Sequence, residues 1–169
     1  VIPTFFKKKS NDRQLEVYNE TLSFFTEKNY NVFGTYDKSS KTWMDITDLV
    51  DPSIIFFTNP YRLTYNKYYI TNFEKYLTVY VPYAFVVIKH LDSHYNQILH
   101  HLVWRHFVET KFHYKYSKMF IKFYNKNAVI SGFPGLDSIY NLEYNPISTW
   151  KNDNSKKLKI IWAPHHTID

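Results

Sequence analysis

Cysteine is absent from the 169 residues of this chain, and glycine occurs only three times. Without cysteine the chain has no disulfide and no thiolate metal site, which fits a reducing compartment such as the cytosol. So few glycines leave no GxGxxG, GxxxxGK[ST] or GxSxG pattern. The local signatures of dinucleotide-binding, P-loop and α/β-hydrolase sites are therefore missing.

Long apolar runs are also lacking. No uninterrupted run approaches the roughly 20 residues that a membrane-spanning helix needs. The opening VIPTFFKKKS places apolar residues before basic ones, the reverse of a secretory signal peptide. This order is typical of a strand that enters a loop, so we expect the chain to begin within an element.

Basic residues exceed acidic ones by 21 to 15, which gives a net charge of +6 at pH 7. This excess favours anionic partners such as nucleotides, polyphosphates or an acidic membrane surface, although a solvated lysine-rich surface would give the same balance. Aromatic residues make up 20% of the chain, but they fall at core spacing. We therefore expect no nucleic-acid partner, because a single-strand surface needs exposed aromatics.

Short apolar runs alternate with amphipathic segments along the chain. Strands are expected at 54–57, 77–81 and 128–131, and helices at about 11–29, 93–110 and 114–124. In the segment 93–110, apolar residues such as Tyr95, Leu99 and Phe107 recur on one helical face. Alternation of this kind is typical of an α/β protein, and it predicts a Rossmann-like parallel sheet flanked by helices.

A polar, asparagine-rich segment at 146–155 is typical of a linker. It predicts that residues 1–145 form most of a Rossmann-like domain and that 156–169 open a second one. The apolar run at 158–162 is interpreted as a buried first strand of that second domain. Because a buried strand needs partners for its backbone groups, the sequence indicates a part of a longer protein.

Six of the eight histidines lie within residues 90–113, which raises the question of a metal site. His90 and His94 have the i, i+4 spacing that two ligands on one helix need. The residues between them favour a loop, however, and no HExxH pattern occurs. His106 borders an apolar face and is typical of a core histidine. We expect no metal.

Two segments are candidates for anion binding. Gly132 to Asp137 follows an expected strand, and its glycines would allow a tight turn before a helix whose N-terminus could hold an anion. His165 and His166 follow Pro164, where imidazoles could donate to a phosphate or act as a general base. The alternatives are an ordinary strand-to-helix turn and two exposed loop histidines.

Five segments, in this order, resemble bacterial CDP-glycerol glycerophosphotransferase-like proteins of teichoic-acid and capsular-polymer synthesis. They are IIFFTNPY (54–61), LTVYVPYAFVV (77–87), HHLVWRHFVETKFH (100–113), AVISGFPGLDSI (128–139) and KIIWAPHHTI (159–168). The resemblance implies a GT-B architecture, in which two Rossmann-like domains face a cleft. The acceptor lies mainly on the first domain and the nucleotide donor on the second.

The resemblance also implies an activity: transfer of glycerol phosphate, or a related alditol or sugar phosphate, from CDP-glycerol or another nucleotide-activated donor. The acceptor would be an anionic teichoic-acid or capsular polymer at the cytoplasmic face of the membrane, and no cofactor is implied. His165 and His166 would act near the donor diphosphate, Asn59 and Tyr83 would line the acceptor side, and the turn from Gly132 to Asp137 would border the cleft. These 169 residues alone would be inactive.

Two departures from the family pattern leave the base and the donor open. Related polymerases carry an HGTP motif where this chain has Tyr80 to Ala84, a segment without histidine. They carry Thr-Trp-Arg where this chain has His165-His166-Thr167. A nucleotide-sugar glycosyltransferase of the same fold, and a non-catalytic module that binds anions or a membrane surface, are therefore the alternatives.

Overall fold

The computed structural model describes residues 11–87, 89–121, 126–141, 150 and 158–162. Two compact units are present, Val1–Gly135 and Leu136–Asp169, and each is described by itself. Most of the predicted linker at 146–155 lies outside the described residues. The domain boundaries predicted from the sequence therefore stay a prediction.

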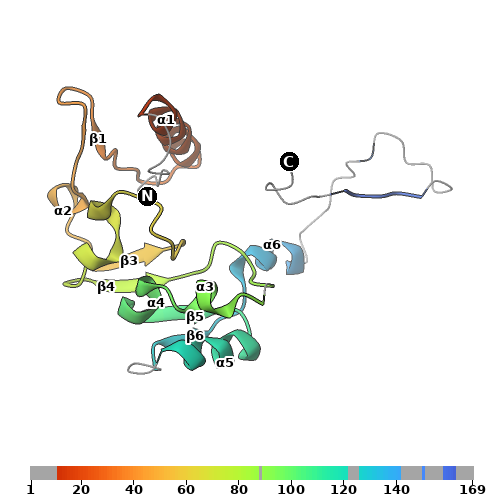
Figure 1. Ribbon diagram of the computed structural model, residues 1–169. Helices are drawn as coiled ribbons and strands as arrows, with labels where there is room; N and C mark the ends of the chain where they lie inside the picture. Colours follow the sequence, from red (N-terminus) through yellow and green to blue (C-terminus); the bar gives the residue numbers. More distant parts are fainter. Residues whose placement is uncertain (1–10, 88, 122–125, 142–149, 151–157, 163–169) are drawn as a thin grey trace. The chain divides into compact units, whose positions relative to one another are not determined.

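The first unit contains a four-stranded sheet in the order β3-β4-β5-β6 (Figure 1). Its strands are β3 (Ile54–Phe57), β4 (Leu77–Tyr80), β5 (Arg105–Val108) and β6 (Ala128–Ile130). Every neighbouring pair is parallel. The sheet confirms the predicted α/β class, and it is consistent with a Rossmann-like fold. Because the strands are parallel, the segments that follow them all emerge at one edge.

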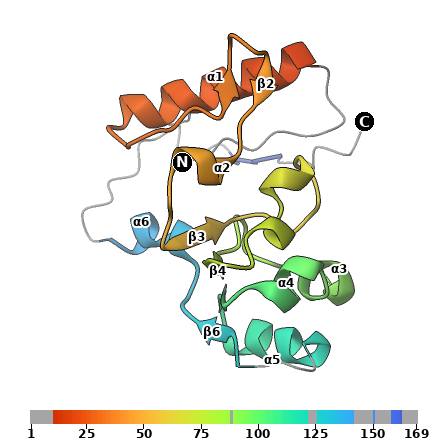
Figure 2. The ribbon, with the colours of Figure 1, turned by 90° about the vertical axis from the view of Figure 1, so that its left-hand side faces the viewer.

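One face of this sheet is covered by helices. Figure 2 shows α3 (Leu91–Tyr95), α4 (Ile98–Leu102) and α5 (Lys111–Phe120) on the same side of it. A core cluster forms on this face from Tyr69, Ile70, Tyr80, Leu99 and Val103. The α4 side chain of Leu99 is completely buried in it. The 3₁₀ turns η1 (Asn66–Tyr68) and η2 (Ile70–Asn72) connect β3 to β4 and contribute to the core.

On the opposite face of the sheet, Val79 is buried, but several other side chains are exposed among the described residues. Strand register places the following apolar side chains together on it, all of them at least one-third exposed: Ile54, Phe56, Leu77 and Val129. In the described part of this unit, helices cover one face of the sheet, whereas a parallel sheet is normally covered on both.

The chain before the sheet packs against β3 and the β3–β4 connection, where Ile46 forms a core cluster with Tyr68 and Phe73. It comprises α1 (Asn11–Glu27), the antiparallel hairpin of β1 (Tyr36–Asp37) and β2 (Thr42–Trp43), and α2 (Ile46–Leu49). The expected first helix is thus confirmed. The buried Tyr18 of α1 packs edge-on against Trp43, with ring centroids 5.2 Å apart. Tyr65 donates a 3.0 Å hydrogen bond to Gln14 and so ties α1 to the β3–β4 connection.

The long helix predicted at 93–110 is wrong. The structure divides this segment into α3, α4 and the strand β5. In β5, His106 and Val108 are buried while Arg105 and Phe107 are half-buried, an alternation with the period of a strand. Because β5 pairs on both sides, with β4 and β6, this ladder outweighs the helical spacing of the apolar residues.

The buried strand predicted at 158–162 is also not observed. Residues 158–162 form no strand in the structure, and their apolar side chains are exposed by 72% or more: Leu158, Ile160, Ile161 and Trp162. The reason is pairing, since a strand needs a neighbour for its backbone groups and none is described for this run. The short η3 (Pro134–Leu136) spans the boundary between the two units, and α6 (Asp137–Tyr140) follows it in the second.

Leu99 and Leu102 provide a test of the covered core, because both lie on α4 but only Leu99 is fully buried. Leu99→Ala should lower the free energy of unfolding by about 2–5 kcal/mol, since it removes buried methyl groups and leaves a cavity. Leu102→Ala, at a side chain 42% exposed, should cost below about 1 kcal/mol. Urea denaturation of the two variants measures both values, and equal losses would contradict this packing.

Candidate functional site

The candidate site is the edge of the sheet where the strands end. Asn59 follows β3, Tyr83 follows β4, Glu109 follows β5 and Gly132 follows β6. Ligands of open α/β sheets bind at this edge, because the loops there are brought together by strand pairing. The structure therefore places the predicted residues Asn59, Tyr83 and Gly132 along one edge.

Asn59 and Tyr83 are held close by main-chain bonds that extend the β3–β4 ladder. Val81 N–H donates to the carbonyl of Phe57 at 2.9 Å, and Tyr83 N–H donates to that of Thr58 at 3.2 Å. The Asn59 side-chain oxygen accepts from Tyr61 N–H at 2.8 Å, which fixes a tight turn. The Tyr83 side chain is 64% exposed and so is accessible to a ligand.

Tyr61 and His94 form a pair at this edge that the sequence did not reveal. The Tyr61 hydroxyl lies 3.2 Å from Nδ1 of His94, a residue of α3. Both side chains are half-buried. Burial raises the pKa of Tyr61, so its phenol stays protonated, and burial lowers the pKa of His94. His94 is therefore a neutral imidazole at physiological pH.

Glu109 and His113 bind the main chain of Val86 from both sides. Val86 N–H donates to a Glu109 carboxylate oxygen at 3.3 Å, and Nε2 of His113 lies 2.8 Å from the Val86 carbonyl. The other ring nitrogen of His113 lies 2.9 Å from the Thr110 hydroxyl and 3.5 Å from Glu109. Thr110 also accepts backbone hydrogen bonds as the N-cap of α5. These contacts position the loop that follows Tyr83.

Two further histidines lie directly beneath the site, in the core. His100 and His106 are at most 1% exposed, and their ring centroids are 5.0 Å apart. Tyr80 of β4 stacks near both, at 5.2 Å and 4.9 Å. Burial lowers the pKa of His100 to about 2 and that of His106 to about 3. The prediction that His106 is a core histidine is confirmed.

The tautomer of His100 follows from its neighbour. Its Nδ1 accepts a 3.1 Å hydrogen bond from Gln97 N–H, so in the neutral ring Nε2 carries the proton. A protonated nitrogen has no lone pair for a metal, which makes Nε2 of His100 unsuitable as a ligand. Among the residues that the structure describes, no group of three or more His, Asp or Glu side chains could hold a metal ion.

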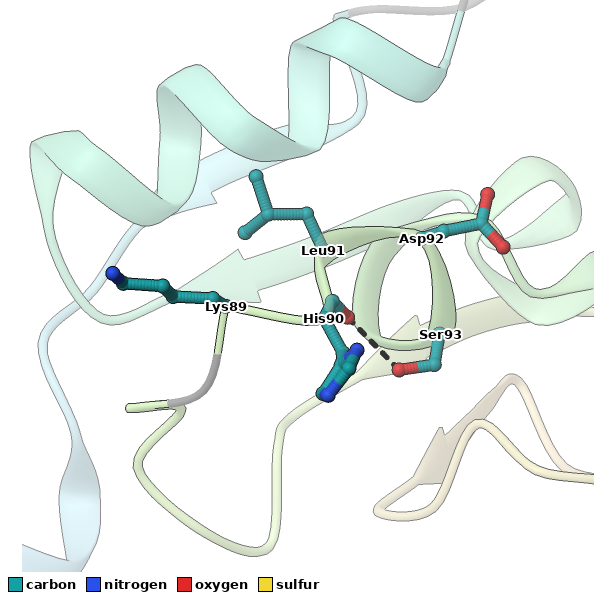
Figure 3. A pocket seen from close by; sticks show the side chains of 5 residues that line it. All are labelled: Lys89, His90, Leu91, Asp92 and Ser93. Atoms are coloured by element: carbon teal, nitrogen blue, oxygen red, sulfur yellow. Dashed lines mark hydrogen bonds between the residues drawn. The ribbon is translucent and has the colours of Figure 1, made fainter.

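A shallow hollow of about 490 Å³ lies beside α3 and is lined by Lys89, His90, Leu91, Asp92 and Ser93. Figure 3 shows that these side chains point in different directions and do not converge on one point. The Ser93 hydroxyl donates a 2.8 Å hydrogen bond to the His90 carbonyl, which stabilises the start of α3. The hollow therefore presents no assembled set of ligand-binding groups.

The remaining predicted residues fall in different places. Gly132 adopts φ of +82°, a conformation that favours glycine, and it follows β6 at the same edge. Asp137 begins α6 in the second unit but does not cap it, because the cap position is Leu136. His165 and His166 lie outside the described residues, so their proposed role is not tested by the structure.

Tyr61, His94, Glu109 and His113 are the site residues that sequence reasoning missed. The spacing of His94 from His90 indicates only a candidate metal ligand. Tyr61 follows the short apolar strand at 54–57, and that position is the one signal the sequence offers for it. The link between Tyr61 and His94 joins residues 33 positions apart, which no local pattern predicts.

Comparisons with known proteins identify no relative. No protein-family model, no curated protein and no solved structure matches this chain. In the described part of the chain, no helix combines the length and apolar character required to cross a membrane.

The two buried histidines predict a dependence of stability on pH. The folded protein keeps both rings neutral down to about pH 3, whereas unfolded histidines take up protons below about pH 6.5. The unfolded state then binds more protons, so the free energy of unfolding should fall as the pH falls. Its slope should approach about 2.7 kcal/mol per pH unit near pH 5, the value for two protons.

Urea titrations between pH 6.5 and 5 measure this slope. His106→Gln should lower this slope by the contribution of one proton, about 1.4 kcal/mol per pH unit. His101→Gln serves as the control, because His101 is exposed on α4. The same slope in wild type and His106→Gln would show that His106 is not held neutral.

The contacts of Val86 predict local protection. Glu109→Ala should accelerate hydrogen exchange of the Val86 amide about tenfold, because a bond worth about 1.4 kcal/mol is lost. Glu74→Ala, at an exposed glutamate, is the matched control. NMR should show faster exchange of the Val86 amide in Glu109→Ala and an unchanged rate in Glu74→Ala. An unchanged rate in Glu109→Ala would contradict the role of Glu109.

Proposed function

We propose that this chain is part of a GT-B-type transferase. It would move glycerol phosphate, or a related alditol or sugar phosphate, from a CDP-activated donor to a teichoic-acid or capsular-polysaccharide acceptor. The observation that carries the proposal is the edge where Asn59, Tyr61, Tyr83 and His94 gather. Two of the segments that resemble glycerophosphotransferases, 54–61 and 77–87, supply the first three of these residues.

The reaction requires an in-line displacement at phosphorus. An acceptor hydroxyl attacks the phosphorus next to glycerol, a new O–P bond forms, and the bond to the CMP oxygen breaks. The hydroxyl proton must pass to a base, and the charge on CMP must be stabilised by hydrogen-bond donors or cations. At the strand-end edge, the imidazole of His94 can accept a proton, and the protonated phenol of Tyr61 lies within hydrogen-bond distance of it.

Each predicted residue has a role in this proposal. Asn59 shapes the turn that presents Tyr61, and the exposed Tyr83 would contact the acceptor. The main chain around Gly132, and Asp137, would border the cleft. His165 and His166 would act near the donor diphosphate. The net charge of +6 supports an anionic acceptor and attachment at the inner, cytoplasmic face of an acidic membrane.

A non-catalytic surface-binding role is the second candidate, and α5 favours it. This helix exposes the apolar side chains of Phe112 and Met119 beside the basic residues Lys111, Lys115 and Lys118. A face of this composition suits an anionic lipid surface. Co-sedimentation with vesicles containing phosphatidylglycerol tests this role. Strong binding to the vesicles, without any measured transfer of glycerol phosphate, would support the surface-binding role instead of the transferase.

Transfer by the complete product of the gene is the direct test of the proposed function. CDP-glycerol, UDP-sugars and GDP-sugars should each be offered as donor together with an oligomeric glycerol phosphate acceptor. We expect turnover only with CDP-glycerol, measured as release of CMP. Release of UDP or GDP would instead indicate a nucleotide-sugar glycosyltransferase. Absence of turnover with every donor would refute the transferase.

Tyr83→Ala should raise the KM for the acceptor about tenfold, which corresponds to about 1.4 kcal/mol of lost binding. Tyr30→Ala removes a comparably exposed tyrosine away from the sheet edge and should leave KM unchanged. Equal effects of the two substitutions would argue against Tyr83 as an acceptor contact.

A further inference from the structure

The described histidines differ in which ring nitrogens are available for chemistry. His100 and His106 are buried in the core. Both nitrogens of His113 face partners, the Thr110 hydroxyl and the Val86 carbonyl. His94 differs from these three, because it is half-buried at the strand-end edge and only its Nδ1 has a hydrogen-bond partner among the described residues.

The partner of Nδ1 decides what Nε2 can do. When the proton is on Nδ1, it is donated to the Tyr61 oxygen, and Nε2 keeps its lone pair. Tyr61 is itself fixed by the turn at Asn59, which accepts its backbone N–H. A general base needs an available lone pair and a neighbouring group that orients its ring. Tyr61 is the group that orients His94.

The charges around His94 suit a base that is neutral before reaction and cationic after it. Burial disfavours the cation, and so does the like charge of His90, which precedes the same helix. Glu109 favours the cation from the end of β5. Tyr61, across from the ring, is an uncharged phenol that can accept from the imidazolium.

We propose that His94 is the general base of the transfer reaction, with Tyr61 as its positioning residue. This inference rests on the proposed function. The acceptor hydroxyl loses its proton to Nε2 of His94 as its oxygen forms the bond to phosphorus. The bond from phosphorus to the CMP oxygen breaks, and CMP leaves with that electron pair. The imidazolium then keeps its Nδ1–H on Tyr61 and releases the Nε2 proton to solvent.

This assignment also accounts for the segment 80–84, which has no histidine. Tyr83 N–H of that segment donates to the carbonyl of Thr58, three residues before Tyr61, so the segment and the His94 pair adjoin one another. A base contributed by α3 can therefore serve the same strand-end edge that β4 and its following loop form.

Kinetics of the complete gene product test both residues. His94→Gln should lower kcat for CMP release about 10²–10⁴-fold and remove the acidic limb of the pH profile, because the proton acceptor is lost. Tyr61→Phe should lower kcat about tenfold with little change in the acceptor KM. It should also move the acidic limb to lower pH, because the imidazolium loses a hydrogen-bond acceptor.

His101→Gln is the matched control. His101 is exposed, and its Nε2 lies 2.9 Å from the Asn96 side-chain oxygen, so activity and pH profile should match wild type. If CMP release is measured and His94→Gln retains at least half of the wild-type kcat, the base is another group while the proposed function stands.

An NMR measurement distinguishes failure of the proposed transferase function from failure of the His94 assignment. Glycerol 3-phosphate, added to this chain up to about 10 mM, enough to fill most of a millimolar site, should shift the Cε1–H resonance of His94. The resonance of His101 should stay unchanged. A shift at His94 without any CMP release would refute the transferase but retain the contact with a phosphorylated alcohol. Absence of a shift would overturn the assignment of His94.

Discussion

The structure depends on keeping two histidines uncharged in the core. His106 is part of β5, the strand that joins β4 to β6, and His100 lies against it from α4. A charge on either ring would have to be desolvated among Tyr80, Tyr95 and Leu99, which is costly without a partner. The pairing of β4 with β5 therefore rests on neutral imidazoles. Asn127 supports the same region, because its side-chain amide donates to the carbonyls of His100 and Val103.

That core determines where the candidate site lies. With β5 seated between its neighbours, Glu109 emerges beside the loop after β4, and its carboxylate holds Val86. The short helix α3 then presents His94 to Tyr61, at the end of β3. Side chains from the segments that follow β3, β4 and β5 thus lie at this edge, and each segment is anchored by the strand before it. A site built in this way is positioned by main-chain pairing rather than by the loops themselves.

Sequence reasoning succeeded where a signal was local and failed where pairing was decisive. The helix expected at about 11–29 and the strands β3, β4 and β6 follow from spacing and from turn residues, and the structure confirms them, with the helix ending at Glu27. The segment 93–110 carried a regular apolar period, yet β5 forms within it because two parallel neighbours satisfy its backbone. The exposed run at 158–162 shows the converse, because apolar composition without a described neighbour does not make a strand.

By itself, the sequence determined the α/β class, the absence of thiol chemistry, the basic charge and the strand-end positions of Asn59, Tyr83 and Gly132. These depend on composition and on neighbours within a few residues, which the order of the chain contains directly. Only the tertiary structure decided that His100 and His106 are buried, that Glu109 and His113 bind Val86, and that Tyr61 meets His94. Each of these contacts joins different elements, and its existence depends on the register of parallel strands, a property that is absent from any one segment.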